Sequence, residues 1–572
     1  MSTHSISIAL VGSGGSGVMT AGSLLLEAAG RAGLYGLMSR SSGPQIRGGE
    51  AAALLRISTR PVFCLGDRFD VLMAIDWLNA ERFAAEIPLD RNSFIAGDDG
   101  VPDEFSASGA ACREVNFKTL AGQGGAGIRP NMLALGLLGA AVGLPPEQLE
   151  EVARKLVGRK GEDAVQASVS ALSIGAANAA LLDGLEKFDI TEQGSKELWN
   201  ISGNESAGLG AIRGGVRFVA AYPITPATEL LEWLAPALEK VGGTLVQAED
   251  ELASVNQLIG ASFGGTPSLT ATSGPGFALM TESIGLAVAS ETPIVVVDVM
   301  RGGPSTGIPT KGEQSDLNIA LYGLHGDAPH VVVAPFSVSD CLFTTQWAVH
   351  LAESLQTAAI VLSDQSLGQT RSVIPRPADI SFNTRRVLQT ETRENYQRYA
   401  AAAGGVSPMA LPGLAGCQYT AEGLEHNARG IPSSRVEDHA RQLDKRRDKL
   451  TSFDYGDHWA HVDGDGPLAI ITWGSSLAPV TEAVETLAAE GVAVRVVAPR
   501  LLMPVQPERM AEALEGVEIA LVLEQSHGAQ FFHYIRAFYA PECELHSIAR
   551  PGPLPIRPGD VINEIRRHWR WS

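Results

Sequence analysis

The sequence predicts an α/β protein of several domains, and three observations support that prediction. The chain has 572 residues, and a usual domain size of ~150 residues predicts three or four units. Hydrophobic residues make up 45% and charged residues 19% of the chain, so it has enough apolar side chains for packed cores. The 62 glycines fit the many tight turns that join strands to helices in α/β folds.

The charge balance and the apolar stretches exclude two kinds of partner. Lysine and arginine together number 44 against 64 acidic residues, which gives a formal net charge of −20. A nucleic-acid-binding surface needs clustered positive charge, so we expect no nucleic-acid partner. The sequence opens without the pattern of a secretory signal, and its longest apolar stretch, Met132 to Leu144, is too short and too glycine-rich to cross a bilayer. We therefore expect a cytoplasmic protein with no membrane partner.

The five cysteines lie far apart in the sequence. They are Cys64, Cys112, Cys341, Cys417 and Cys543, and no two form a CxxC pair. This spacing argues against a disulfide framework in a long cytoplasmic chain. Iron–sulfur clusters usually require closely spaced thiolates. We therefore expect no metal site in this chain, and a cluster, if the protein transfers electrons, in another chain.

Residues 1–190 are predicted to form one α/β domain. It opens with a strand at Ser5–Val11, a GSGGSG turn at Gly12–Gly17 and a helix at Val18–Ala32. The turn has the glycine pattern of dinucleotide-binding loops, but the acid expected about 20 residues later is absent from the next predicted strand. The pattern therefore does not favour NAD, although the amides of the turn suit a phosphate or a carboxylate. Further elements are expected at Ala51–Ile57, Val71–Ile75 and Asn131–Val142.

A second α/β domain is predicted at residues 207–375, after a polar segment at Leu185–Leu209 that we interpret as a linker. Apolar strands alternate here with helical patterns at the spacing of a mostly parallel sheet. Strands are expected at Arg217–Ala221, Thr244–Gln247, Leu269–Ala271, Ile294–Val299, His330–Ala334 and Ala359–Leu362, and helices at Glu251–Phe263 and Gly276–Ser290.

The remaining chain divides into two regions of different character. Residues 376–460 are rich in charged side chains and lack long apolar runs, so they predict a connecting segment. Such a segment either packs against a neighbouring domain or is a solvated linker. Residues 461–572 predict a third α/β unit that begins with the strand in LAIITWGSS, after Pro467. A helix at Leu477–Glu490 and strands at Ala493–Val497 and Ile519–Leu523 are expected to follow.

Four predicted strand ends within residues 207–375 carry polar or rigid loops. Two prolines fix the loop YPITP at Tyr222–Pro226, and the acids Glu249–Glu251 begin a helix. A Ser-Gly-Pro-Gly turn follows Thr272, and Arg301 precedes a polar loop at residues 305–311. Each feature alone has a structural explanation, such as a rigid turn or the preference of helix N-termini for acids. Because ligands bind at the carboxyl ends of strands in open α/β sheets, the four together predict a binding site.

At these loops the sequence resembles the α subunit of the 2-oxoacid:ferredoxin oxidoreductases. The resemblance rests on YPITP at Tyr222–Pro226, EDE at Glu249–Glu251, TSGPG at Thr272–Gly276 and RGGPSTGIPT at Arg301–Thr310. It extends over nearly the whole chain. The GSGGSG turn and QIRGG at Gln45–Gly49 resemble the family's γ domain, VSPMALPG at Val406–Gly413 resembles its connecting segment, and LVLEQSHGAQ at Leu521–Gln530 resembles its C-terminal domain. The order of these motifs implies a fused γ/α subunit.

The resemblance implies an identity for each predicted unit. Residues 1–190 are expected to be a γ-like α/β domain, 207–375 a thiamine-diphosphate pyrimidine-binding α/β domain, and 461–572 a transketolase-C-like α/β domain, with 376–460 as the connecting segment. The family decarboxylates a 2-oxoacid on thiamine diphosphate, passes two electrons through an iron–sulfur cluster to ferredoxin and transfers the acyl group to coenzyme A. Some members run in reverse to fix carbon dioxide. The α subunit is expected to hold the aminopyrimidine end of the cofactor.

The resemblance also implies catalytic roles. A glutamate must hydrogen-bond the pyrimidine ring, so that the imino form of the cofactor acts as a base. Glu251 is expected in this role, and Glu249 is the competing assignment. A 2-oxoacid carboxylate needs a fixed cation and neutral donors, which Arg301 and Thr225 are expected to supply.

Further residues are expected to line the same pocket. Pro226, Thr306, Thr310 and Lys311 are expected to complete the substrate site. Tyr222, Pro223, Ile224, Ser273 and Gly274 are expected to contact the cofactor, together with Glu249 and Glu251.

A separate β subunit is expected to complete the active site. Gly464–Gly466 looks like the start of the thiamine diphosphate motif whose Asp and Asn bind Mg²⁺, but no Asn occurs between Pro467 and Val561. We therefore interpret this segment as a turn. The resemblance implies that the β subunit holds the diphosphate, Mg²⁺ and a [4Fe–4S] cluster, with ferredoxin as electron acceptor and a (γα)₂β₂ assembly.

The expected substrate is 2-oxoglutarate, with coenzyme A as co-substrate. This expectation rests on the fused organisation and on the polar loop Ser305–Lys311, which suits a second carboxylate. A broad-specificity, pyruvate or branched-chain 2-oxoacid enzyme is the rival. A self-sufficient transketolase-like enzyme predicts a complete Mg²⁺ motif in this chain. A non-enzymatic nucleotide-binding regulatory protein predicts an acid near residues 39–41.

Overall fold

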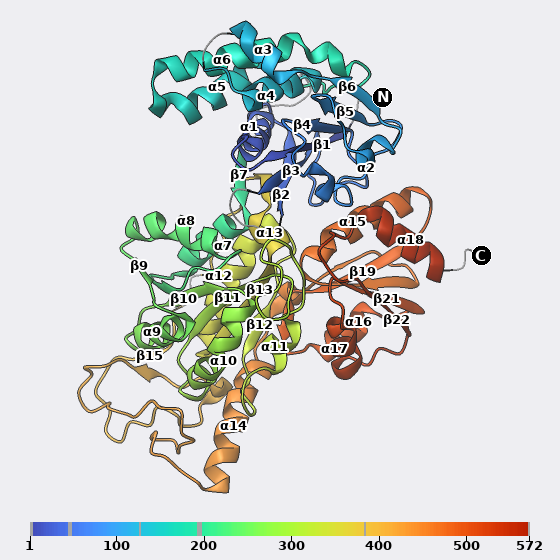
Figure 1. Cartoon of the computed structure of the whole chain (residues 1–572). Helices are drawn as coiled ribbons and strands as arrows, with labels where there is room; N and C mark the ends of the chain where they lie inside the picture. Colours follow the sequence, from blue (N-terminus) through green and yellow to red (C-terminus); the bar gives the residue numbers. More distant parts are fainter. Residues whose placement is uncertain (1–3, 44–48, 125–126, 191–196, 383–384, 570–572) are drawn as a thin grey trace. The chain divides into compact units, whose positions relative to one another are not determined.

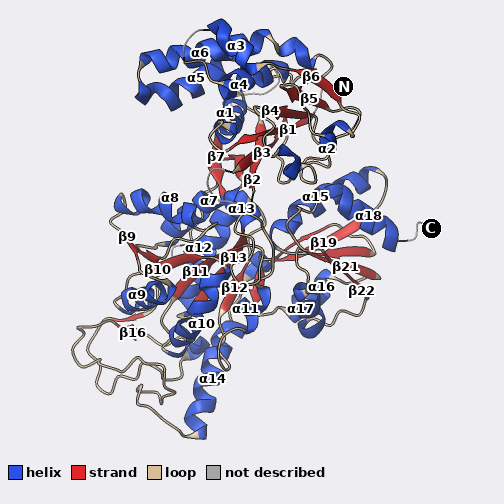
Figure 2. Ribbon diagram, in the orientation of Figure 1, coloured by secondary structure: helices blue, strands red, loops and turns tan. Residues whose placement is uncertain are grey.

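The computed structural model describes residues 4–43, 49–124, 127–190, 197–382 and 385–569 (Figure 1). They fall into two compact units, which are described one at a time. The first holds the chain up to Ser202 with Gln369–Ala378 and Leu554–Val561, and the second holds Gly203–Gly368, Asp379–Pro553 and the residues from Ile562. Both units combine helices with β-sheet, as predicted (Figure 2). No helix in these described ranges is long and apolar enough to span a membrane.

The first unit is built on an eight-stranded mixed sheet of order β6-β5-β4-β1-β3-β2-β14-β7. Successive residues of β1 point to opposite faces, so Ile8 and Leu10 pack under the helices while Ala9 and Val11 enter a second apolar cluster. The strands are β1 Ser5–Ser13, β2 Tyr35–Ser42, β3 Glu50–Ser58, β4 Val71–Ala74, β5 Phe94–Gly97, β6 Ala111–Glu114, β7 Leu198–Ser202 and β14 Arg371–Pro375. The helices are α1 Val18–Arg31, α2 Asp103–Ser106, α3 Phe117–Gly124, α4 Pro130–Ala141, α5 Pro146–Val157 and α6 Glu162–Ala177.

The second unit contains a seven-stranded sheet of order β20-β12-β13-β11-β10-β8-β9, parallel except for β20. Its apolar strands are buried under helices on both faces, as parallel sheets require. The strands are β8 Phe218–Ala221, β9 Thr244–Gln247, β10 Ser268–Thr272, β11 Ile294–Met300, β12 Val331–Val333 and β13 Ala358–Asp364. The helices are α7 Gly203–Gly214, α8 Thr228–Glu239, α9 Glu251–Phe263, α10 Gly274–Ala289, α11 Leu317–Tyr322, α12 Val338–Leu355 and α13 Gln365–Gln369.

The linker interpretation of Leu185–Leu209 was wrong for its second half, which contains β7 and the start of α7. The glycines of α7 conceal it, because they lower helix propensity and interrupt the apolar period. They are needed for close packing: a Cβ at Gly210 would overlap the carbonyl oxygen of Leu342 on α12, and one at Gly214 would lie 2.8 Å from Val349 Cβ. The helix is therefore stabilised by a neighbour that is distant in sequence.

The C-terminal part of the second unit adds a five-stranded sheet of order β17-β19-β18-β21-β22. Its strand β20 leaves that sheet and extends the seven-stranded sheet instead, next to β12. Gly464–Gly466 connects β17 to β18, as the turn interpretation predicted. The elements are β17 Ala460–Asp463, β18 Leu468–Ile471, α15 Leu477–Ala489, β19 Val494–Pro499, β20 Leu501–Met503, α16 Pro507–Ala513, β21 Ile519–Glu524, α17 Gln530–Phe538, β22 Glu544–Ala549 and α18 Pro558–His568. The predicted domain limits at 190, 207, 376 and 461 remain predictions.

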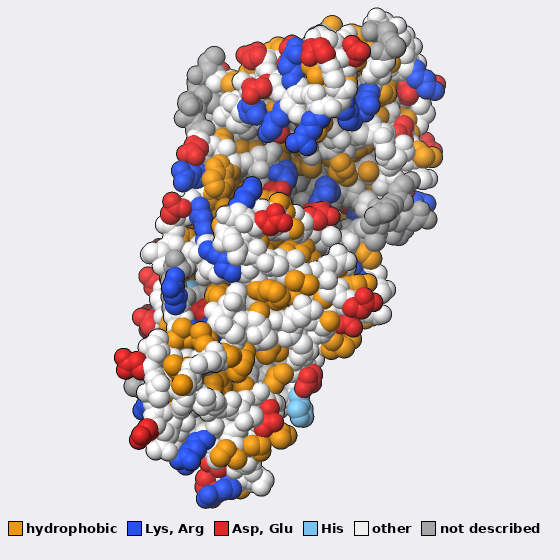
Figure 3. Space-filling model, turned by 90° about the vertical axis from the view of Figure 1, so that its left-hand side faces the viewer, with side chains coloured by type: hydrophobic (Ala, Val, Ile, Leu, Met, Phe, Trp, Pro, Cys, Tyr) orange, Lys and Arg blue, Asp and Glu red, His pale blue; other side chains and the backbone are white. Residues whose placement is uncertain are grey.

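Several large apolar side chains of the second unit stay on its surface. In the lower part of Figure 3, hydrophobic side chains gather in groups between polar ones. Three of the exposed side chains, Tyr222, Leu252 and Leu279, follow the neighbouring strands β8, β9 and β10.

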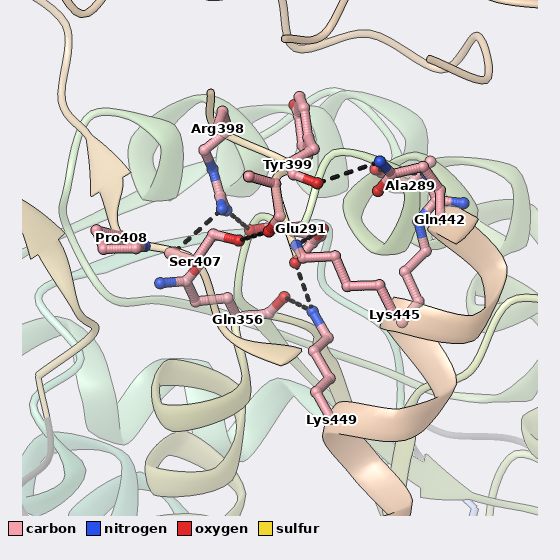
Figure 4. Close-up of polar contacts among 12 residues, drawn as sticks. Ala289, Glu291, Gln356, Arg398, Tyr399, Ser407, Pro408, Gln442, Lys445 and Lys449 are labelled. Carbon is pink, nitrogen blue, oxygen red and sulfur yellow. Dashed lines mark hydrogen bonds and ion pairs between the residues drawn. The ribbon is translucent and has the colours of Figure 1, made fainter. Parts of the chain in front are cut away.

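The connecting segment packs against the second unit and is not a solvated linker. It contains the short strands β15 Leu388–Gln389 and β16 Met409–Ala410 and the helix α14 Val436–Thr451. Figure 4 shows Lys445 and Lys449 of α14 pointing at Glu291, which follows α10. Lys449 Nζ donates to Glu291 Oε2 at 3.0 Å and to the carbonyl oxygen of Gln356 at 2.8 Å. Burial alone would raise the pKa of Glu291, but the charges of the two lysines keep that pKa well below its ordinary value.

Candidate active site

The polar loops that the sequence placed at strand ends lie at one edge of the parallel sheet. The strands β9, β8, β10 and β11 are neighbours, and all run in the same direction. From β8 the chain goes to β9 on one side and then returns to β10 on the other. The carboxyl ends of β8 and β10 therefore flank a switch point, which is where ligands bind in open α/β sheets.

Arg301 joins two of these loops. It follows β11, and its Nη1 donates to the carbonyl oxygen of Thr225 at 2.6 Å. Arg301 is only 7% exposed, so it is not a surface arginine. Burial lowers the pKa of Arg301 while the carboxyls of Asp316 and Asp298 act in the opposite direction, and an arginine remains charged in any case. A fixed cation therefore lies beside the YPITP loop.

The YPITP loop is anchored at Pro226 and exposed at its first two residues. Pro226 is buried, and its carbonyl oxygen accepts a hydrogen bond from Asn204 Nδ2 at 3.0 Å. Ile224 and Thr225 are half-buried, whereas Tyr222 and Pro223 are exposed. The predicted cofactor residues of this loop are thus presented at the sheet edge by a fixed backbone.

The structure distinguishes the three acids at the start of α9. Glu249 is exposed, and Asp250 caps the helix by accepting from the amide of Ala253 at 2.7 Å. Glu251 is buried, and its carboxyl lies against Gly276: a Cβ there would be 2.6 Å from Glu251 Oε1. Only Glu251 therefore reaches the TSGPG turn at the end of β10.

The TSGPG turn brings several buried polar groups together. Ser273 is fully buried, and no described group hydrogen-bonds its Oγ. Its neighbour Gly274 begins α10 and lies against the carboxyl of Asp316. In the described residues, the Nε of Arg301 also lacks a partner. Buried polar groups without partners are rare in proteins and favour a bound ligand or water here.

The predicted loop after Arg301 folds back, so that its end at Lys311 hydrogen-bonds its start at Gly302. Ile308 N–H donates to Gly302 O at 2.7 Å, and Gly302 N–H donates to Lys311 O at 3.0 Å. Thr310 and Lys311 consequently return to the level of Gly302, next to Arg301. Thr306 lies at the exposed far end of the loop. The structure thus brings Thr310 and Lys311 to the site but does not bring Thr306 there.

Comparisons with known proteins show the family. Three family models match the chain: the thiamine diphosphate-binding domain of pyruvate flavodoxin/ferredoxin oxidoreductase at residues 209–445, pyruvate ferredoxin/flavodoxin oxidoreductase at 7–178, and the transketolase C-terminal domain at 457–547. The 2-oxoglutarate synthase subunit KorA of Methanothermobacter marburgensis is 35% identical over 377 residues, which are 64% of this chain and 98% of that protein. The chain belongs to the 2-oxoacid:ferredoxin oxidoreductase family, as an α subunit.

Two more relatives in this oxidoreductase family cover different shares of the chain. The α subunit of the 2-oxoacid:ferredoxin oxidoreductase of Saccharolobus solfataricus is 36% identical over 59% of this chain and 56% of that protein. The solved structure of 2-oxoglutarate:ferredoxin oxidoreductase from Magnetococcus marinus, with 2-oxoglutarate, coenzyme A and succinyl-CoA bound, is 36% identical. It covers 99% of both chains with a TM-score of 0.91. The predicted multidomain α/β class is therefore confirmed.

The site fits the aminopyrimidine end of the family's thiamine diphosphate. Glu251 supplies a buried carboxyl, and Ser273 supplies a hydroxyl with no described partner. An iron–sulfur cluster does not fit the described residues, because no group of three metal-ligating side chains occurs among them and all five cysteines are free.

The C-terminal domain of this oxidoreductase subunit holds the loop that follows Arg301, which the sequence did not reveal. Gln314 is fully buried, and its Nε2 donates to the carbonyl oxygen of Trp473 at 2.9 Å. Its Oε1 accepts from the amide of Gln525 at 2.8 Å and from Ser476 Oγ at 3.0 Å. A glutamine in a polar loop carries no signal that distinguishes this role.

The sequence also did not reveal two acids beside the site, of which Asp298 is fully buried and Asp316 is half-buried. Asp298 lies inside β11, and Asp316 precedes α11. The signal for Asp298 was available, because it is the one acid within the apolar strand IVVVDVM. A buried acid in such a strand needs a compensating partner.

The GSGGSG turn of the first unit holds a carboxylate of its own chain. The amide of Ser13 donates to both carboxylate oxygens of Asp76 at 3.0 Å, and Ser13 Oγ donates at 2.8 Å. This interaction takes up a donor that an external phosphate or carboxylate would use. Gln45–Gly48 of the QIRGG motif lie outside the described residues.

Proposed function

We propose that this α subunit works with a β subunit in the oxidative decarboxylation of 2-oxoglutarate to succinyl-CoA, with reduction of ferredoxin. The observation that carries the proposal is the buried cation of Arg301, fixed on Thr225 and bordered by Lys311 and Thr310. A dicarboxylate needs cationic or donor groups at both ends, and we assign Arg301 to one end and Lys311 with Thr310, whose main chain returns to Gly302, to the other. The bound 2-oxoglutarate, coenzyme A and succinyl-CoA of the Magnetococcus marinus enzyme support the same substrates.

The residues of this chain have separate tasks in the proposed reaction. Thiamine diphosphate, when bound, supplies the carbanion chemistry that releases carbon dioxide. Arg301 binds and orients the carboxylate next to the 2-oxo group, and the Thr225 backbone fixes the guanidinium. Glu251 hydrogen-bonds the pyrimidine ring, because its carboxyl lies against Gly276 in the turn that carries Ser273. Lys311 and Thr310 bind the distal carboxylate.

A β subunit is expected to cover this edge of the sheet. The exposed side chains Tyr222, Leu252 and Leu279 support this, because each lies on a segment that follows one of the strands β8, β9 and β10. The diphosphate, Mg²⁺, the [4Fe–4S] cluster and the ferredoxin contact are assigned to that subunit, in a cytoplasmic (γα)₂β₂ assembly. Operation in reverse, as carbon dioxide fixation, is part of the same proposal.

The test is co-expression with a β subunit and an assay of coenzyme A-dependent viologen reduction. The substrates are 2-oxoglutarate, pyruvate and 3-methyl-2-oxobutanoate. We expect the highest kcat/KM with 2-oxoglutarate and no turnover from the α subunit alone. A preference for pyruvate would refute the substrate assignment, and turnover without the β subunit would refute the divided active site.

A further inference from the structure

The loop of residues 302–316 is held at the carboxyl edge of the C-terminal sheet. In that sheet the chain passes from β18 to β19 on one side and returns to β21 on the other, so the ends of β18 and β21 flank a switch point. Ligands bind at such points in open α/β sheets. Here the side chain of Gln314 hydrogen-bonds the carbonyl oxygen of Trp473, after β18, and the amide of Gln525, after β21. A residue of the loop therefore takes the place of a ligand.

The same loop has a second attachment at Thr310. Gln365, the first residue of α13, is only 8% exposed, and its Nε2 donates to the carbonyl oxygen of Thr310 at 2.9 Å. The next residue, Ser366, lies against the loop as well: a Cβ at Gly312 would be 2.6 Å from Ser366 Oγ. The part of the loop that carries Thr310 and Lys311 is therefore fixed on the start of α13.

The start of α13 is held in turn by the C-terminal domain. Asp364, the last residue of β13, is buried, and its Oδ1 accepts from the amide of Leu367 at 2.9 Å. Its Oδ2 accepts a hydrogen bond from Ser475 Oγ. One carboxylate thus joins the first turn of α13 to the turn that follows β18, and this contact fixes the backbone from which Gln365 extends.

The turn after β18 consequently holds the loop at two points. Ser476 Oγ donates to Gln314 Oε1 at 3.0 Å, while the neighbouring Ser475 acts on Thr310 through α13. Lys311 lies between these two points in the sequence. Its main chain is therefore held on both sides by buried hydrogen bonds that do not involve Arg301.

We propose that Gln365 and Ser475 are positioning residues for the second carboxylate of the substrate and determine the preference for a dicarboxylic 2-oxoacid. Arg301 is fixed separately, on the carbonyl oxygen of Thr225. Loss of the Gln365 contact therefore moves Thr310 and Lys311 and leaves the other end of the substrate site in place. A site built to bind a polar group discriminates against analogues that lack it only while its donors are held in position. The inference rests on the proposed assignment of Lys311 and Thr310 to the distal carboxylate.

The test compares Gln365→Leu with the unmodified protein in the complex with the β subunit, at saturating coenzyme A and viologen. Leucine is similar in size and has no donor. The KM for 2-oxoglutarate is expected to rise about tenfold, since one buried hydrogen bond contributes about that factor, and kcat is expected to change less than about twofold. 2-Oxopentanoate has the same chain length but lacks the second carboxylate. Its competitive inhibition constant against 2-oxoglutarate is expected to change less than about twofold, because Arg301 is untouched.

Ser475 supplies a milder pair of variants. Ser475→Ala removes the hydrogen bond to Asp364 at a half-buried position and is expected to raise the KM for 2-oxoglutarate about fivefold. Ser475→Thr keeps the hydroxyl and is expected to retain a KM within about twofold of the unmodified value. An unchanged KM in both Gln365→Leu and Ser475→Ala would overturn the inference.

Gln346→Leu is the matched control. Gln346 is a buried glutamine of α12, and its Nε2 donates to the carbonyl oxygens of Ile380 and Phe382 at 2.8 and 3.1 Å, outside the loop. This variant is expected to lower the Tm and to leave the KM for 2-oxoglutarate unchanged. Equal rises of KM in Gln346→Leu and Gln365→Leu would overturn the inference. So would an equal rise, in Gln365→Leu, of the KM for 2-oxoglutarate and the inhibition constant of 2-oxopentanoate.

The variant Lys311→Met separates the inference from the proposed function. A normal KM for 2-oxoglutarate in Lys311→Met would refute the assignment of the distal carboxylate, and the inference with it. A raised KM in Lys311→Met, combined with an unchanged KM in Gln365→Leu, would refute the inference alone.

Discussion

One methyl group at Gly276 is expected to displace Glu251. A Cβ at this position would lie 2.6 Å from Glu251 Oε1 and 2.7 Å from its Cγ, whereas ordinary contacts begin at 3.4 Å. The same Cβ would overlap Thr272 Oγ1 in the strand below, so the methyl group has little freedom to shift. In Gly276→Ala the carboxyl of Glu251 must therefore move by about 0.8 Å, because the glutamate is the more flexible neighbour.

The expected consequence is a loss of turnover with the fold preserved. A displacement of about 1 Å in a positioned catalytic group costs roughly 100-fold in rate, so a loss of kcat approaching that factor is expected. Overpacking of this kind costs about 1–3 kcal/mol of stability, which leaves a multidomain protein folded. The KM for 2-oxoglutarate is expected to change little, because Arg301 and Lys311 are untouched.

The matched control is Gly285→Ala in the same helix α10. A Cβ at Gly285 meets nothing within 4 Å, and alanine favours the helix by about 1 kcal/mol. Both variants would be assayed with the β subunit for kcat and KM, with circular dichroism as the measure of fold. Normal kcat in Gly276→Ala, or equal losses in both variants, would refute the assignment of Glu251.

Three further changes test other parts of the structure. Arg301→Ala is expected to lower kcat/KM by about 30-fold or more with an unchanged circular dichroism spectrum, because a buried charge-paired contact is worth about 2–5 kcal/mol. A near-normal kcat/KM would contradict the role of Arg301 in binding the substrate carboxylate. Gln314→Leu removes three side-chain hydrogen bonds at about 1 kcal/mol each, so proteolysis of the loop after Arg301 is expected to become faster. An unchanged rate of proteolysis would show that the Gln314 side chain does not anchor the loop. Lys449→Met leaves the buried Glu291 with one lysine and is expected to cost about 3–5 kcal/mol of stability, measured as a lower Tm. The control Lys240→Met, at an exposed lysine, should leave the Tm unchanged. Equal effects of the two substitutions on Tm would contradict the buried ion-pair explanation.

Local sequence patterns predicted the second domain well. The strand at Thr244–Gln247 and the helix at Glu251–Phe263 match β9 and α9, and the other parallel strands of that sheet are within two residues at each end. The antiparallel strand β20 of the same sheet was not predicted. Apolar runs bounded by turn residues describe buried parallel strands, and this information is local. The four loops at strand ends also came from the sequence, because the direction of parallel strands places their carboxyl ends at one edge.

Two elements that are stabilised by neighbours distant in sequence, α7 and β14, were not predicted. The helix α7 has too many glycines for its own period to show, and it is held by close packing on α12. The strand β14 joins the sheet of the first unit through β2 and β7. The pairing partner of a strand is set by long-range contacts, so its own residues do not identify it.

The sequence by itself determined the α/β class, the family motifs and the residue types needed for 2-oxoacid chemistry. Only the tertiary structure decided which of two neighbouring acids faces the turn, because Glu251, the first residue of α9, is buried while Glu249, before the helix, is exposed. It also decided that the carboxyl of Asp316 lies against Gly274, at the start of α10. The charge of a buried group depends on the atoms packed around it, and those atoms come from parts of the chain that are far apart in sequence.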